Sequence, residues 1–64
     1  MEALRRIRES RGLSQAELAR RARVGRSSLI DWEAGRTTPR SKPLQRVAEV
    51  LGVAMEELLN GKSA

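Results

Sequence analysis

Apolar side chains recur along the chain at the three- and four-residue spacing of helices, in five short segments. The clearest repeat, at i, i+3, i+4 and i+7, consists of Leu44, Val47, Ala48 and Leu51. At or near the end of each segment stands a glycine, which ends helices readily because it adopts the left-handed conformation; these are Gly12, Gly25, Gly35, Gly52 and Gly61. The pattern predicts an all-α fold of five helices: about 2–11, 15–22, 26–34, from an N-cap at Ser41 to Gly52, and 55–60.

The second predicted helix opens with the sequence of a capping box, Ser-Gln-Ala-Glu. The Ser14 hydroxyl is expected to accept from the Glu17 amide, and the Glu17 carboxylate from the Ser14 amide. The helix then begins at Gln15, and its free N–H groups form a favourable position for a phosphate. The fifth predicted helix has only half of this motif, because Glu57 is present but the N-cap position holds Ala54.

Only Arg23, Val24 and Gly25 separate the second and third predicted helices. Two short helices joined by a tight turn form a helix-turn-helix, here 15–34, the unit whose second helix enters the major groove of DNA. The turn is unusual in two places. Arg23 stands where a positive φ is expected, at a cost of about 1 kcal/mol, and Gly25 stands at an N-cap where Ser or Thr is preferred.

The third predicted helix has one core face and one face of a different character. At about 100° per residue, Leu29 and Trp32 share the core face. The opposite face carries side chains suited to reading base edges, namely Arg26, Ser27, Ile30 and Asp31. Two alternatives stay open there. Ile30 meets either a thymine methyl or a protein surface, and Asp31 either accepts from cytosine or orients a nearby arginine.

Charge favours nucleic acid as the partner. The net charge is +5, and twelve of the 13 Lys and Arg residues precede residue 47. Phosphate contacts are expected from the start of the second helix and from the polar loop after the third, through Ser14, Gln15, Arg36, Thr37 and Arg40. As an alternative to a phosphate contact, the Arg40 side chain enters a minor groove.

Composition argues against several other functions. The chain has no cysteine and no histidine, and it shows no glycine-rich phosphate loop, so we expect no metal, no cofactor and no enzymatic activity. A single aromatic residue, Trp32, excludes a base-stacking platform. No apolar run approaches the roughly 20 residues of a membrane span, and no signal-peptide pattern is present, so a cytoplasmic protein is expected.

Several segments resemble, in order, the Cro/repressor-type helix-turn-helix domains of phage and bacterial regulators. They are RGLSQAELARRA, EAG, PLQRVAEVLGV and MEELLNG, and the resemblance spans about Leu4 to Asn60. It implies a compact five-helix bundle, a lambda-repressor-like DNA-binding domain at residues 1–61, followed by a tail at residues 62–64.

The resemblance also implies roles for individual residues. Gln15 matches a glutamine that binds phosphate and can bridge to the third helix, and Ser28 matches a position that often meets the DNA backbone. Arg8 and Glu33 match an ion pair that ties the first helix to the end of the third. Arg36 matches a basic position in a phosphate-contacting loop, and the family's base-reading positions hold Arg26, Ser27 and Asp31.

The implied function is a sequence-specific transcriptional regulator, most often a repressor. It would bind a palindromic operator as a homodimer, formed in solution or only on DNA, with half-sites about 34 Å apart. The alternative is a protein-interaction module on the same fold, antitoxin-like or bridging, with Ile30 and Leu59 in its interface. A steep loss of affinity with salt distinguishes the DNA-binding protein.

Overall fold

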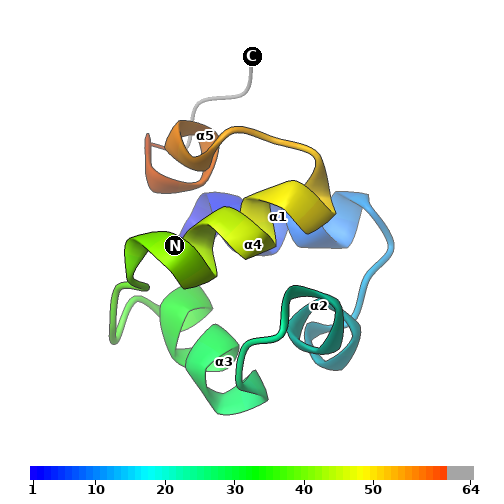
Figure 1. Ribbon diagram of the computed structural model, residues 1–64, viewed down its shortest axis with the longest axis horizontal. Helices are drawn as coiled ribbons and strands as arrows, with labels where there is room; N and C mark the ends of the chain where they lie inside the picture. The colour runs from blue at the N-terminus through cyan, green and yellow to red at the C-terminus, as the bar shows by residue number, and fades with distance from the viewer. Residues whose placement is uncertain (61–64) are drawn as a thin grey trace.

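The computed structural model describes residues 1–60, and within that range it contains five helices and no strand. The helices are α1 (Glu2–Ser10), α2 (Gln15–Ala22), α3 (Arg26–Ala34), α4 (Ser41–Leu51) and α5 (Met55–Asn60), as Figure 1 shows. The predicted all-α fold is confirmed. Gly61 and the predicted tail at 62–64 lie outside the described residues.

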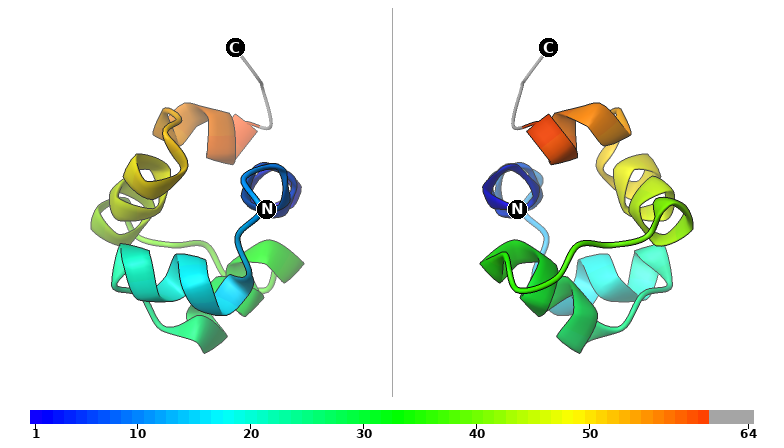
Figure 2. Two further views of the ribbon diagram at one scale, coloured as in Figure 1. Left: turned by 90° about the vertical axis from the view of Figure 1, so that its right-hand side faces the viewer. Right: turned by 90° about the vertical axis from the view of Figure 1, so that its left-hand side faces the viewer.

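The helices enclose one hydrophobic core, which is aliphatic except for Trp32. α2 and α3 lie on one side of it and α5 on the opposite side, while α1 and α4 connect the two sides (Figure 2). Every helix supplies at least one fully or nearly fully buried large side chain; the set includes Leu4, Leu18, Leu29, Leu44, Val47 and Leu58. Each such side chain stabilises the fold by about 1.5–3 kcal/mol through burial, which holds α3 in place with its other face exposed.

The capping box at the start of α2 is confirmed. Ser14 Oγ accepts from the Glu17 N–H at 3.0 Å, and Glu17 Oε1 accepts from the Ser14 N–H at 3.3 Å. Hydrogen bonds from the Ser14 backbone and then from its hydroxyl lower the pKa of the Glu17 carboxyl below its ordinary value. The first turn of α2 therefore keeps a negative charge, which suits the positive end of the helix dipole.

The start of α4 differs from the prediction. Arg40, not Ser41, is the N-cap, with φ −72° and ψ 166°, and Ser41 is the first helical residue. Pro43 is compatible with either boundary, because no N–H group in the first turn of a helix has a partner within the helix, and a proline there loses no hydrogen bond. At the other end, Gly52 closes α4 with φ 73°, as predicted. Helix α1 ends at Ser10, one residue before the predicted end, and Arg11 is its C-cap.

The turn between α2 and α3 keeps both unusual features. Arg23 has φ 58°, and among the described residues it is the one non-glycine with a positive φ. Gly25 is the N-cap of α3 and makes no side-chain cap bond. An arginine from α4 supports the turn: Arg46 Nε donates to Ala22 O at 2.8 Å, and its Nη2 donates to Arg23 O at 3.2 Å. Tertiary contact thus offsets part of the local strain.

The start of α5 yields a stability prediction. Glu57 Oε2 already accepts from the Ala54 N–H at 2.7 Å, so half of a capping box is formed. Ala54→Ser would add the missing side-chain acceptor for the Glu57 N–H. We expect a gain of about 1 kcal/mol, seen in a thermal melt as a Tm higher by roughly 4–8 °C.

The matched control is Ala34→Ser, which places serine at the last residue of α3, where it caps no N-terminus. That substitution should give no gain. An Ala54→Ser protein that melts at the wild-type temperature would contradict the expected role of residue 54.

Candidate nucleic-acid interface

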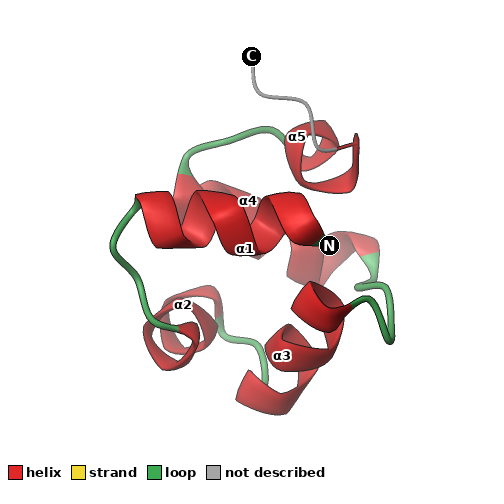
Figure 3. Ribbon diagram, turned by 180° about the vertical axis from the view of Figure 1, so that it is seen from behind, coloured by secondary structure: helices red, strands yellow, loops and turns green. Residues whose placement is uncertain are grey.

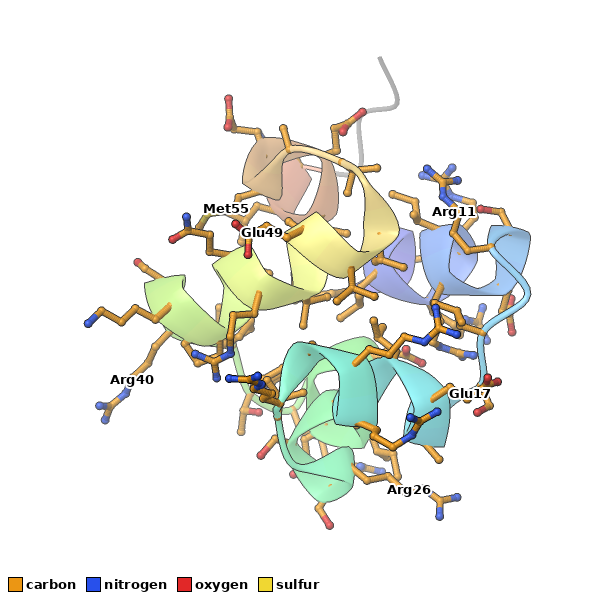
Figure 4. The ribbon with its side chains drawn as sticks, turned by 45° about the vertical axis from the view of Figure 1, so that its right-hand side comes forward. Arg11, Glu17, Arg26, Arg40, Glu49 and Met55 are labelled. Atoms are coloured by element: carbon orange, nitrogen blue, oxygen red, sulfur yellow. The ribbon has the colours of Figure 1, made fainter. Side chains whose placement is uncertain are left out.

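The exposed face of α3 carries the residues predicted to read bases. Leu29 is fully buried and Trp32 is 7% exposed on the core face. On the other face Arg26 and Ser27 are exposed, and Ile30 and Asp31 are partly exposed. α3 begins at the edge of the molecule farthest from α5 (Figure 3), and Arg26 projects outward from that end (Figure 4). The start of α3, with Arg26, therefore lies at the end of the molecule opposite α5 (Figure 3 and Figure 4).

The residues predicted to contact phosphate lie at the start of α2, within α3 and in the segment that follows α3. Ser14 is exposed at the start of α2, and Ser28 is exposed in the first turn of α3. Arg36 and Thr37 are exposed in the loop after α3. Arg40 extends into solvent from the start of α4 (Figure 4). Candidate phosphate contacts are thus exposed on the same helix as the predicted reading residues and on the segments next to it.

Glu33 joins three helices behind this surface. Its Oε2 accepts from Arg8 Nε at 2.7 Å, and its Oε1 accepts from Arg8 Nη2 at 3.1 Å and from Gln15 Nε2 at 3.0 Å. The Glu33 and Arg8 side chains are only 4% and 10% exposed. Arg8 Nη1 also donates to Leu13 O at 2.7 Å, next to the start of α2. This network fixes the beginning of α2 against the last turn of α3.

Gln15 keeps hydrogen-bonding capacity toward solvent. Its side-chain amide has two N–H donors, and the structure uses one of them on Glu33. The residue is half-buried, in keeping with this inward contact. The second side-chain N–H and the backbone N–H groups of Gln15 and Ala16, which the capping box does not use, remain suited to an anion.

Asp31 is paired with Arg36 from the following loop. Arg36 Nη1 donates to Asp31 Oδ1 at 3.0 Å, and the Arg36 backbone N–H donates to Asp31 O at 2.9 Å. Gly35, with φ 80°, turns the chain back so that Arg36 lies over the last turn of α3. Of the two roles left open for Asp31, the structure contains the pairing with an arginine, and the partner is Arg36.

Ile30 is half-buried rather than fully exposed. It lines a groove of about 400 Å³ between α1, the start of α2 and α3, together with Glu2, Arg5, Gln15, Glu33 and Ala34. Part of the side chain is therefore covered by the protein itself, which explains how an isoleucine is tolerated on this face.

Three arginines make contacts within the protein that stabilise the fold. Arg8 is held by Glu33. Arg11 Nε donates to Leu51 O at 3.1 Å at the end of α4, and Arg46 binds the end of α2. Cations at helix C-termini satisfy free carbonyl groups and interact favourably with the helix dipole. Sequence spacing carries no signal for the last two contacts, because they join residues 40 and 24 positions apart.

Arg26 and Arg40 differ from these arginines. Neither forms a hydrogen bond through its side chain or an ion pair with any residue in the described range. Both are exposed. Their charges are therefore available to an anionic partner.

Two features are absent from residues 1–60. No helix there is long and apolar enough to cross a membrane. Within the same range, no group of three or more Cys, Asp and Glu residues is arranged to hold a metal ion.

A family model described as helix-turn-helix matches residues 4–58 of the chain. The chain is 38% identical over 60 residues to the HTH-type transcriptional regulator DdrOP3 of Deinococcus deserti, covering 94% of this chain and 46% of that protein. It is 31% identical over 61 residues to the HTH-type transcriptional activator BcrR of Enterococcus faecalis, covering 95% and 30%.

A third relative is the SPbeta prophage-derived uncharacterized HTH-type transcriptional regulator YonR of Bacillus subtilis. The identity is 33% over 63 residues, covering 98% of this chain and 58% of that protein. The chain thus spans between 30% and 58% of the length of these curated relatives. What each relative shares with it is a segment of 60 to 63 residues.

The Glu33 network leads to a prediction. Glu33→Gln would leave the buried Arg8 guanidinium without its counter-ion. Glu9 compensates little, because its Oε2 lies 3.9 Å from Arg8 Nη2 and its side chain is 61% exposed. We expect the free energy of unfolding to fall by about 3 kcal/mol. Urea denaturation followed by Trp32 fluorescence measures this loss.

Glu49→Gln is the matched control, because Glu49 is an exposed carboxylate on α4 (Figure 4). It should change stability by no more than about 0.5 kcal/mol. Equal unfolding midpoints for the two variants would show that the buried pair does not hold the helices together.

Proposed function

The chain belongs to the Cro/repressor-type helix-turn-helix family, and from this premise we propose that it binds double-stranded DNA sequence-specifically, with α3 in the major groove. Through this binding it acts as a transcriptional regulator, and more specifically as a repressor. One observation carries the proposal: the exposed face of α3 projects from the molecule, begins with an unpaired arginine, and is flanked by hydrogen-bond donors and cations.

The reading residues have chemistry that matches base edges. Arg26 can donate two hydrogen bonds to guanine, and Ser27 can contact several bases. Asp31 can accept from the amino group of cytosine. The open part of Ile30 suits a thymine methyl, although its other part lies against the groove beside α1. These four side chains are the proposed source of sequence preference.

The proposed phosphate contacts lie on both sides of α3. They would fix the orientation of α3 in the groove without selecting a sequence. The set combines side-chain donors with cations: Ser14, Gln15, Ser28, Arg36, Thr37 and Arg40. The Glu33 network supports this arrangement, because it holds the Gln15 amide at a fixed position relative to α3.

We further propose that two copies bind a palindromic operator. One α3 of nine residues contacts only a few base pairs, so two half-sites about one helical turn apart are needed for a unique site. The Leu59 side chain, 52% exposed on α5, favours a contact between copies there, whereas Leu58 is in the core and Met55 packs against it.

Selection from a pool of random-sequence duplexes tests the proposal. Binding is followed by fluorescence anisotropy over a salt series, and the bound fraction is sequenced. We expect an enriched palindrome and a slope of log K against log salt of about −0.9 for each phosphate neutralised. Weak binding without enrichment, lost at physiological salt, would contradict the proposal and direct the search to a protein partner at Leu59.

A pair of variants separates reading from positioning. Arg26→Ala should weaken operator binding by about 1–3 kcal/mol and relax the preference at one base pair. Arg40→Ala, which removes another unpaired and exposed cation, should weaken operator and random duplex alike. Anisotropy titrations on both duplexes measure the two effects, and equal losses on operator and random DNA for both variants would contradict the role of Arg26.

A further inference from the structure

We infer that Asp31 raises specificity by pairing with Arg36, because the pair lowers the affinity of the protein for non-cognate DNA. The inference rests on the proposed function and deepens it. Asp31 is then a specificity-determining residue even at sites where its carboxylate contacts no base. Its effect passes through a cation that would otherwise bind phosphate of any sequence.

The geometry of the pair is the first step. Asp31 Oδ1 and Arg36 Nη1 are 3.0 Å apart, and the Arg36 backbone N–H is itself bonded to Asp31 O at 2.9 Å. The short turn through Gly35 thus anchors the base of the Arg36 side chain beside its partner. Pairing here needs little further ordering of the chain.

Exposure is the second step. The Asp31 and Arg36 side chains are 42% and 67% exposed, so solvent screens their attraction and a phosphate can compete for the guanidinium. Exposed ion pairs typically change an equilibrium by no more than about fivefold. The pair is therefore weak enough to open on DNA and strong enough to reduce binding measurably.

Charge is the third step. Of the three arginines proposed to contact DNA, Arg36 alone has an ion-pair partner within the described residues, whereas Arg26 and Arg40 have none. On non-cognate DNA, Arg36 binds phosphate either beside the negative charge of Asp31, which reduces the attraction, or by leaving the Asp31 carboxylate unpaired among phosphates. At a cognate site, a cytosine amino group can donate to Asp31 and compensate for the loss of Arg36. The pair therefore penalises non-cognate sites more than the operator.

The test uses Asp31→Asn, measured on random-sequence duplex and on the selected operator. On random duplex we expect affinity to increase about two- to fivefold and the salt slope to steepen by about 0.9, the value for one additional phosphate. Affinity for the operator should rise less than affinity for random duplex, or should fall. The ratio of operator affinity to random-duplex affinity therefore decreases. Glu49→Gln, with the same change of charge on α4, should leave that ratio unchanged.

A double-mutant cycle with Arg36→Gln distinguishes pairing from simple removal of a negative charge. With Arg36 replaced, Asp31→Asn should no longer steepen the salt slope on random duplex. The same tightening and steepening in both backgrounds, or an unchanged slope in the single variant, would overturn the inference while leaving the proposed function intact. A wild-type protein that binds no duplex would overturn the proposed function itself. Thermal melts confirm that each variant is folded.

Discussion

The buried carboxylate of Glu33 is the contact on which the relative placement of α1, α2 and α3 depends. It accepts hydrogen bonds from α1 and from the first residue of α2 while it belongs to the last turn of α3. Burying an ion pair costs desolvation, and hydrophobic residues of the same volume often stabilise a protein equally well. The value of this pair therefore lies in geometry, because the same carboxylate joins α1 and the start of α2 to the last turn of α3.

The positive charge of the chain serves two purposes, and only the folded structure separates them. Arg8, Arg11 and Arg46 bind a carboxylate or the free carbonyls at helix ends. Because these helices are short, their unsatisfied ends form a large fraction of their length, and cations from neighbouring helices satisfy them. The net charge of +5 thus overestimates the positive charge that is available to attract phosphate, since these three arginines are used in contacts within the protein.

Features set by local sequence could be predicted, and features set by tertiary contact could not. The capping box at Ser14 depends on residues three positions apart, and the ends of α3 and α4 depend on neighbouring glycines, so the sequence suffices for them. The N-cap of α4 was predicted wrongly, because Ser41 and Arg40 are both compatible with the proline that follows. The support of the strained turn by Arg46 joins distant residues and leaves no periodic signal. The pattern on α3 identified an exposed set of candidate reading residues, but it could not show that Arg36 is the partner of Asp31.

The orientation of α3 is controlled mainly from its two ends. Its core face offers Leu29 and Trp32 as large buried side chains, which allow rotation about the helix axis more readily than a long apolar stripe would. At the first end, Arg46 holds the turn through Arg23 O. At the second end, Glu33 binds Arg8 in the interior, and Asp31 binds Arg36 at the surface. The last turn of α3 therefore has a polar contact on its buried side and another on its exposed side. A polar contact at either end therefore sets where the exposed side chains of α3 lie relative to the rest of the fold.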